Sequence, residues 1–289
     1  MPNRSRLNSA EAPMIFVAGP YFAKTREAIS QNIDAAMTEG KKLFKMGFLA
    51  LVVHNHTHHF EEKTKIGEPV YRAFDRLLIL KTVDAIKCLR NWRASQGARM
   101  EVATIHKAGK PVFESDSSLL SWAAGKPHAS VTRILLEEAD QAALDAPTPD
   151  IKVALTLGPF VSPQDDHQYH YKTVLAAEEH SIQLWNAGIP ALSPQRALCD
   201  LDVSFEQYRH FTDRLIAAGV ASCALALPGW EDDPESFRQV AKAASMGLTI
   251  LGDVASVLQF AKGEKGYYEV GITDPFNEHG NPCNQNLSS

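Results

Sequence analysis

The stretch Asn91-Trp92-Arg93-Ala94-Ser95-Gln96-Gly97-Ala98-Arg99-Met100-Glu101 decides how this chain is interpreted. An apolar segment at 84–89 precedes it, and a segment with helical character at 98–108 follows it. Ser95 and Gly97 are therefore predicted in a strand-to-helix turn, with Glu101 in the first turn of the helix. Free amides at a helix N-terminus bind anions, and Gly97 lets a ligand approach the backbone closely. The stretch predicts an anion site with a carboxylate about one helical turn away, a spacing that brackets a ribose.

The same stretch also has a plainer interpretation, in which Ser95 only caps the helix of a strand-to-helix turn. Ser-x-x-Glu capping boxes are common. Glu101, however, lies six residues after Ser95, outside that geometry. Local pattern leaves both interpretations open.

Length and composition are those of a globular protein with room for two domains. The chain has 289 residues, of which 45% are hydrophobic and 22% charged. The net charge of -5 gives no support for nucleic-acid binding. Four cysteines lack CxxC spacing, which indicates reduced thiols and a cytoplasmic location. They are Cys88, Cys199, Cys223 and Cys283.

We expect no membrane attachment. Residues 1–13 are polar and lack the apolar core of a signal peptide, so they are predicted to be a flexible N-terminus. No apolar run in the chain has the length of a membrane span.

Strand-like and helix-like segments alternate over the first hundred residues. The strands are predicted at 14–18, 48–53, 84–89 and 112–113, and the helices at 25–46, 71–81 and 98–108. This order predicts an α/β fold with a doubly wound parallel sheet. Ligands of such sheets bind at the carboxyl ends of the strands. Gly19, His54 and Ser95 each follow a strand, so we expect them to converge.

The pattern recurs after a linker, which defines the predicted organisation of the chain. The segments are a flexible N-terminus at 1–13, a first domain at 14–118, a helical linker at 119–150 with its helix at 130–144, a degenerate second repeat at 151–262 and a tail at 263–289.

The repeats differ where the chemistry is expected. Counting from Trp92 and Trp230 without a gap places Asp213 in the position of Asp75. On that register Ser95, Gly97 and Glu101 become Asp233, Glu235 and Gln239. An acidic pair cannot cradle a phosphate, and a glutamine cannot be a carboxylate nucleophile. The first repeat therefore keeps a plausible site, and the second does not.

These motifs resemble the nucleoside 2-deoxyribosyltransferase-like superfamily, and most closely its DUF4406-type branch. The resemblance rests on Val17-Ala18-Gly19-Pro20-Tyr21, Gly47 with the His54 loop, Asp75, the stretch 92–101 and Gly109-Lys110-Pro111-Val112. It covers 14–113 well and 151–251 in degraded form. It implies two tandem flavodoxin-like domains, cleavage of N-glycosidic bonds, and no cofactor or metal.

The resemblance also implies roles for individual residues. Glu101 falls on the family's nucleophile and Asp75 on its aspartate near the leaving base. Ser95 followed by Gly97 favours a nucleoside 5′-monophosphate, and Met100 replaces an aromatic residue before the nucleophile. Such chemistry needs a carboxylate beneath the anomeric carbon and a second acidic group near the base. The further candidates for substrate binding are Gly19, Pro20, Tyr21, His54, His56, Asp84 and Trp92.

Several of these residues have structural alternatives. Asp75 could pair with Arg72 or Arg76 on its own helix. Arg93 and Arg99 could be solvated surface charges, although either could reach a phosphate.

The histidine-rich loop after the second strand has three interpretations. His54, His56 and His58 alternate, which is one arrangement for zinc, but no cysteine or carboxylate cluster accompanies them. We therefore predict no metal site. Contact of His54 or His56 with the substrate, and a merely polar loop, both remain.

Two functions remain on sequence alone. The first is an enzyme that acts on a small nucleotide through Glu101, as an N-glycosidase or a deoxyribosyltransferase. The second is a non-catalytic nucleotide-binding or sensor protein on the same fold. For assembly, we expect repeat two to pack on repeat one as a built-in partner. The alternative is two independent domains, with repeat one pairing between chains.

Overall fold

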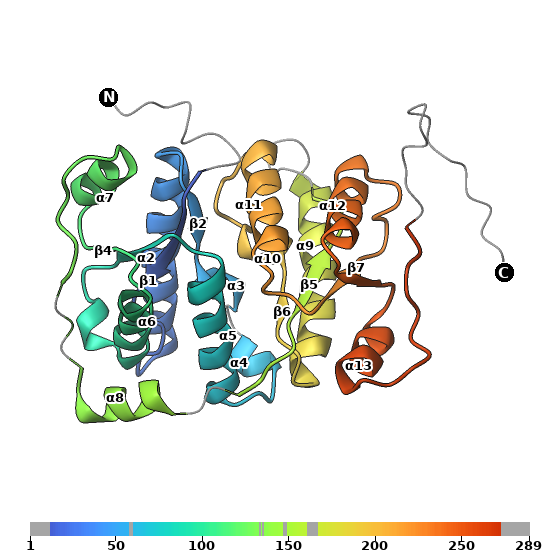
Figure 1. Ribbon diagram of the computed structural model, residues 1–289, viewed down its shortest axis with the longest axis horizontal. Helices are drawn as coiled ribbons and strands as arrows, with labels where there is room; N and C mark the ends of the chain where they lie inside the picture. The colour runs from blue at the N-terminus through green and yellow to red at the C-terminus, as the bar shows by residue number, and fades with distance from the viewer. Residues whose placement is uncertain are drawn as a thin grey trace.

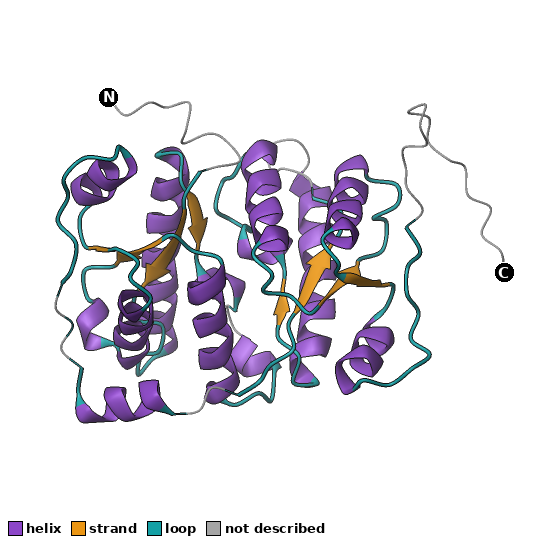
Figure 2. Ribbon diagram, in the orientation of Figure 1, coloured by secondary structure: helices purple, strands orange, loops and turns teal. Residues whose placement is uncertain are grey.

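The computed structural model describes residues 12–57, 60–132, 134, 136–146, 149–160 and 167–272. Over these residues the chain forms two four-stranded sheets flanked by helices, as Figure 1 and Figure 2 show. All strand pairs within the two sheets are parallel. The strand orders are β2-β1-β3-β4 and β6-β5-β7-β8, which match the start of the flavodoxin-like order. The predicted α/β fold with two tandem flavodoxin-like domains is confirmed.

The elements of the first repeat follow the predicted alternation. They are β1 Met14–Ala18, α2 Arg26–Lys45, β2 Leu49–Leu51, α3 Val53–His56, α4 Phe60–Lys63, α5 Glu68–Lys81, β3 Ala85–Cys88, the 3₁₀ turn η1 Trp92–Ala94, α6 Gln96–Lys107, β4 Val112–Phe113 and α7 Asp116–Ala123. All five residues of β1 are buried, as expected for a strand in a parallel sheet with both faces covered.

The second repeat follows the linker helix α8 Glu138–Asp145. Its elements are β5 Ala154–Leu157, α9 His167–Asn186, β6 Ala191–Leu192, α10 Pro194–Ala197, α11 Phe205–Ala217, β7 Cys223–Ala226, α12 Pro234–Ser245, β8 Thr249–Leu251 and α13 Val254–Lys262.

Three predicted boundaries are corrected. Helix α7 runs across the predicted domain end at 118, and Leu119 is fully buried in the core, so the first repeat extends to Ala123. The linker is helical only from Glu138, eight residues later than expected. The predicted loop at His54 begins as the short helix α3.

The first part of the predicted C-terminal tail packs on repeat two. Glu269 forms an antiparallel bridge with Leu251 at the edge strand β8, and the Val270 amide donates to the Ile250 carbonyl at 2.8 Å. The remaining tail residues and the predicted flexible N-terminus up to residue 11 lie outside the described residues.

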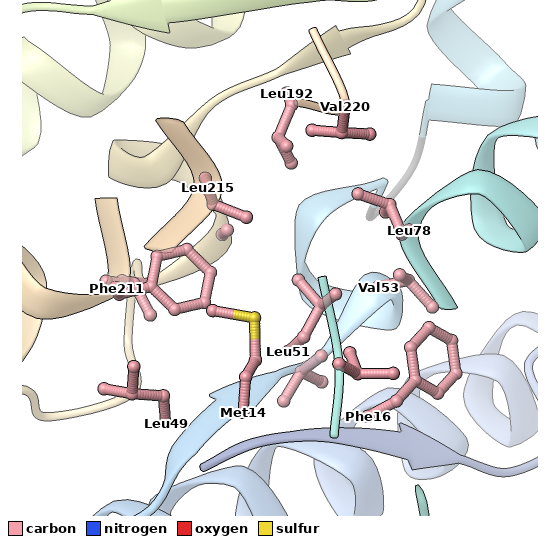
Figure 3. Packing of buried hydrophobic residues seen from close by; sticks show 14 of the residues in the cluster. Met14, Phe16, Leu49, Leu51, Val53, Leu78, Leu192, Phe211, Leu215 and Val220 are labelled. Carbon is pink, nitrogen blue, oxygen red and sulfur yellow. The ribbon is translucent and has the colours of Figure 1, made fainter. Parts of the chain in front are cut away.

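The two repeats pack directly on each other. The Asn55 side chain donates to the carbonyls of Ala197 and Cys199 at 3.2 and 2.6 Å. Figure 3 shows Phe211 of α11 beside Met14 of β1, and both belong to one continuous apolar core. The core therefore extends from one sheet to the other through α11.

None of the described helices combines the length and the apolar character that crossing a membrane requires.

Candidate active site

Ser95 begins helix α6. It is the N-cap, with extended backbone angles, and its Oγ accepts a hydrogen bond from the Ala98 amide at 3.3 Å. The capping role considered from sequence is therefore real. It leaves the hydroxyl proton of Ser95 available to a ligand, because the cap uses only an oxygen lone pair.

A cavity of about 450 Å³, here called the main cavity, opens at the carboxyl edge of the first sheet. It is lined by residues from the loop after β1, from α3, from α5 and from the start of α6. The predicted residues that it brings together are Gly19, Pro20, Tyr21, His54, Asp75, Ser95, Gly97 and Glu101. The sequence predicted this convergence for Gly19, His54 and Ser95, each of which follows a strand, because the carboxyl ends of parallel strands meet at one edge of the sheet.

Asp75 on α5 and Glu101 on α6 form an interacting pair of carboxyl groups in this cavity. Burial raises the pKa of Asp75 to about 7. Burial, and then the charge of Asp75, raise the pKa of Glu101 well above its usual value. Glu101 Oε2 is buried and has no hydrogen-bond partner. Two such groups side by side resist joint ionisation.

His54 fixes the loop after β1 at the edge of the main cavity. Its Nε2 lies 3.1 Å from the Gly19 carbonyl and 3.2 Å from the Pro20 carbonyl. Because carbonyls only accept, Nε2 carries the proton and Nδ1 is left as an acceptor. Burial lowers the pKa of His54, so the ring is neutral at physiological pH and holds the loop by hydrogen bonding alone.

Arg72 is a site residue that the sequence analysis did not assign. Its Nη2 donates to Glu68 at 2.6 Å and to the Gln96 side chain at 3.3 Å, so it bridges α5 and the first turn of α6. Among the described residues that line the main cavity, it is the only lysine or arginine. Its position three residues before Asp75 on the same helix is the signal that could have found it.

Neither arginine that was considered for phosphate binding reaches the main cavity. Arg93 pairs with Glu114 and lies over the Trp92 ring. Arg99 pairs with the fully buried Asp140 of α8 at 2.6 Å. Both have structural roles.

Three predicted substrate-binding residues lie elsewhere, which corrects their assignment. His56 Nε2 accepts from the Ser193 amide at 3.0 Å, in the contact between the repeats. Asp84 stands at the amino end of β3, the end opposite the main cavity, and pairs with Arg214 at 2.6 Å. Trp92 is buried, and its Nε1 donates to Glu114 at 2.9 Å.

The histidine loop offers no metal centre within the part of the chain that the structure describes. Over those residues no three His, Cys, Asp or Glu side chains are grouped so that they could hold an ion. His58 and His59 lie outside the described residues.

The second repeat preserves the frame of this site. Helices α6 and α12 are displaced by 138 positions at both ends, from 96 to 234 and from 107 to 245. Asp233 is the N-cap of α12, as Ser95 is of α6. The counterpart of Glu101 is therefore Gln239, as predicted.

The predicted counterpart of Asp75 is wrong by one residue. The N-caps of α5 and α11 are Gly67 and Ser204, and the eighth residue after each is Asp75 and Thr212. Asp213 takes the position of Arg76 instead. The gapless count misplaced it because the chain from the N-cap of α11 to β7 is one residue longer than that from the N-cap of α5 to β3. Repeat two thus lacks both carboxyl groups of the pair.

In the second repeat, charged and aromatic side chains occupy the corresponding region. Arg238 donates to Asp213 at 2.8 Å and to Glu235 at 2.6 Å. Lys242 also pairs with Asp213, at 3.1 Å. Nearby, the rings of Phe160 and Tyr208 stack with centroids 3.7 Å apart.

Comparison with known proteins identifies one family model. A model described as "Domain of unknown function (DUF1937)" matches residues 13–117, which cover the first repeat as far as the start of α7. No curated protein matches the chain, and no solved structure matches it. The matching model carries no function and differs from the DUF4406 type that the sequence resembles. The resemblance to nucleoside deoxyribosyltransferases therefore stays a prediction.

Proposed function

We propose that the first repeat cleaves the N-glycosidic bond of a nucleoside 5′-monophosphate, with Glu101 as the nucleophile. The observation that carries the proposal is the pair Asp75 and Glu101, whose pKa values are both raised, in a cavity that also contains the N-terminus of α6. A carboxylate and a carboxylic acid side by side are what glycosidic cleavage needs.

The two carboxyl groups divide the work in two steps. Glu101 attacks the anomeric carbon as the carbon–nitrogen bond breaks, and Asp75 gives its proton to the departing base. Water then attacks the same carbon, Asp75 takes a proton from it, and Glu101 is released. In this reaction the pair holds one shared proton. Positive charge developing on the sugar favours the ionised form of Glu101, which leaves the proton on Asp75.

A phosphate group has hydrogen-bond donors among the residues that line the main cavity. The hydroxyl of Ser95 and the amides at the start of α6 face an anion favourably. Arg72 contacts Gln96 in the same turn, and its guanidinium can exchange the exposed Glu68 for a phosphate. These groups support a 5′-monophosphate over a free nucleoside.

The test incubates the full-length protein with a panel of ribonucleoside and deoxyribonucleoside 5′-monophosphates. Release of the free base is measured by chromatography. We expect Glu101→Gln to lower the rate by several powers of ten while nucleotide binding in calorimetry survives. Glu179→Gln, at an exposed position of α9, is the matched control and should be normal. Adding a second free base separates transfer from hydrolysis.

Two results would contradict the proposal. Near-normal turnover by Glu101→Gln would remove Glu101 as the nucleophile. Nucleotide binding by the wild type without release of any base would favour the non-catalytic nucleotide-binding protein.

A further inference from the structure

A second cavity adjoins the main cavity and is here called the side chamber. It has a volume of about 230 Å³ and lies between α5, α6 and the linker helix α8. Asp75 and Glu101 line both spaces. A molecule that extends from the main cavity into the side chamber therefore passes the carboxyl pair.

The walls of the side chamber are largely apolar. Its lining includes Ala73, Ile79, Met100, Ala143 and Leu144. Its polar lining consists of the carboxyl pair together with Glu68, Arg72, Arg76 and Thr104, so it offers both hydrogen-bond donors and acceptors. Such a surface suits an uncharged flat ring whose faces are apolar and whose edge carries hydrogen-bonding atoms.

Helix α8 is held over the side chamber by specific contacts. Arg99 of α6 binds the buried Asp140 through Nε at 2.6 Å and Nη2 at 3.1 Å. Arg76 Nη1 donates to the Leu144 carbonyl at 3.3 Å, and Lys107 pairs with Asp145 at 3.3 Å. A buried ion pair with two hydrogen bonds fixes the helix in place, so α8 forms an ordered wall of the side chamber.

The volume limits what the side chamber accepts. Pockets for drug-sized ligands occupy roughly 300–1,000 Å³, so a space of about 230 Å³ holds a ring and not a whole nucleotide. The main cavity, at about 450 Å³, has room for a sugar and its phosphate.

We propose that the side chamber is the subsite for the heterocyclic leaving group of the substrate, an uncharged flat ring, and that α8 is its specificity wall. This inference rests on the proposed function, because it places the glycosidic bond between the two spaces beside Asp75 and Glu101. It assigns a role in recognition to a helix of the linker between the repeats.

The test fills the side chamber from α8 and measures the binding of free nucleobases, and of ribose 5-phosphate, to the full-length protein by calorimetry. Ala143→Trp places a bulky ring in the chamber, whereas Ala142→Trp, at the exposed neighbouring position, is the matched control. We expect Ala143→Trp to weaken nucleobase binding at least tenfold and to leave ribose 5-phosphate binding unchanged. Ala142→Trp should change neither.

Two outcomes would overturn the proposal. One is nucleobase binding that survives Ala143→Trp but is lost in Tyr21→Ala, which would place the ring in the main cavity. The other is no nucleobase binding by the wild type at millimolar concentration. Should Ala143→Trp disturb the fold, Met100→Ala widens the chamber from α6 and should alter the preference among bases. An unchanged preference would count against the proposal.

The outcomes for the side chamber and for the reaction are distinguishable. Base release by the wild type with a normal Ala143→Trp variant would retain the reaction and remove the subsite. Nucleobase binding that depends on Ala143, without base release from any nucleotide, would retain the subsite and remove the reaction.

Discussion

The helix pair α5 and α6 of the first repeat corresponds to the pair α11 and α12 of the second. The side chains between the two helices differ in kind. In the first repeat, Arg76, Met100 and Thr104 border the side chamber. The residues at their positions in the second repeat are Asp213, Arg238 and Lys242, which form an ion-pair cluster. The second copy therefore neutralises its charges internally, and the first copy keeps a carboxyl pair without such partners.

On the proposed function, this difference separates the copy that binds the substrate from the copy that packs against it. Burial of a charged group without a partner is unfavourable, and a protein that only had to fold would fill the space as repeat two does. The same burial raises the pKa values of Asp75 and Glu101. Perturbed carboxyl groups in an open cavity are a feature of functional sites, whereas repeat two has the packing of a structural partner.

The largest expected effect comes from separating the copies. A fragment that ends after α7, at Gly125, loses α11 and exposes the apolar residues Met14, Leu49 and Leu51 that Figure 3 shows facing it. We expect it to aggregate or to self-associate and to lose activity. Size-exclusion chromatography with light scattering, against the full chain, is the measurement. A soluble, monomeric and fully active fragment would show that the second copy is not needed.

The next largest effect is expected from a substitution that gives the first repeat the residue found at the equivalent position of the second. Met100→Arg places the counterpart of Arg238 beside Asp75 and Glu101, where its charge lowers both pKa values and its side chain fills the side chamber. We expect base release to fall at least a hundredfold, because the pair loses its shared proton. Met246→Arg, at an exposed methionine, is the control. An unchanged rate and pH profile in Met100→Arg would separate the pair from the chemistry.

The smallest effect is on stability and has opposite signs in the two copies. The pKa of Asp75 is about 7 in the folded protein and about 3.9 in an unfolded chain. The folded state thus binds this proton more tightly, and Asp75 lowers the stability progressively as pH rises from about 4 to about 7. Asp75→Asn should therefore stabilise at pH 8 by on the order of 1–3 kcal/mol and have little effect below pH 4.

The matched change in the second copy is Asp213→Asn. Asp213 pairs with Arg238 and Lys242, so its loss should destabilise the protein at pH 8. Urea unfolding of both variants at pH 4 and pH 8 measures the sign of each change in the free energy of unfolding. Destabilisation by Asp75→Asn at pH 8 would mean that its carboxyl group has a favourable partner.

The sequence predicted those features that depend on local pattern and strand order. Alternating segments defined the sheets, and the rule that ligands gather at carboxyl ends of strands brought Gly19, His54 and Ser95 together. The register between α6 and α12 was also predictable, because neither helix contains an insertion.

The errors arise where a side chain serves a contact distant in sequence. His56 and Asp84 looked available, but they bind Ser193 and Arg214 of the other repeat. Local pattern carries no information on such pairs. Asp213 was misplaced by one added residue, a shift that moves a helical side chain by about 100° around the axis. The packing of α8 against α6 could not be predicted either, because it depends on a buried ion pair between Arg99 and Asp140.

Helix α8 adds a difference between the two copies that comes from the connectivity of the chain. A chain with two copies of a domain has one connecting segment between them, so a wall built from that segment can serve only one copy. A symmetric pair of separate chains has no such segment and would keep either two equal sites or none. Here the first copy has the wall, and in the second copy, which has none, Asp213 is paired with Arg238 and Lys242.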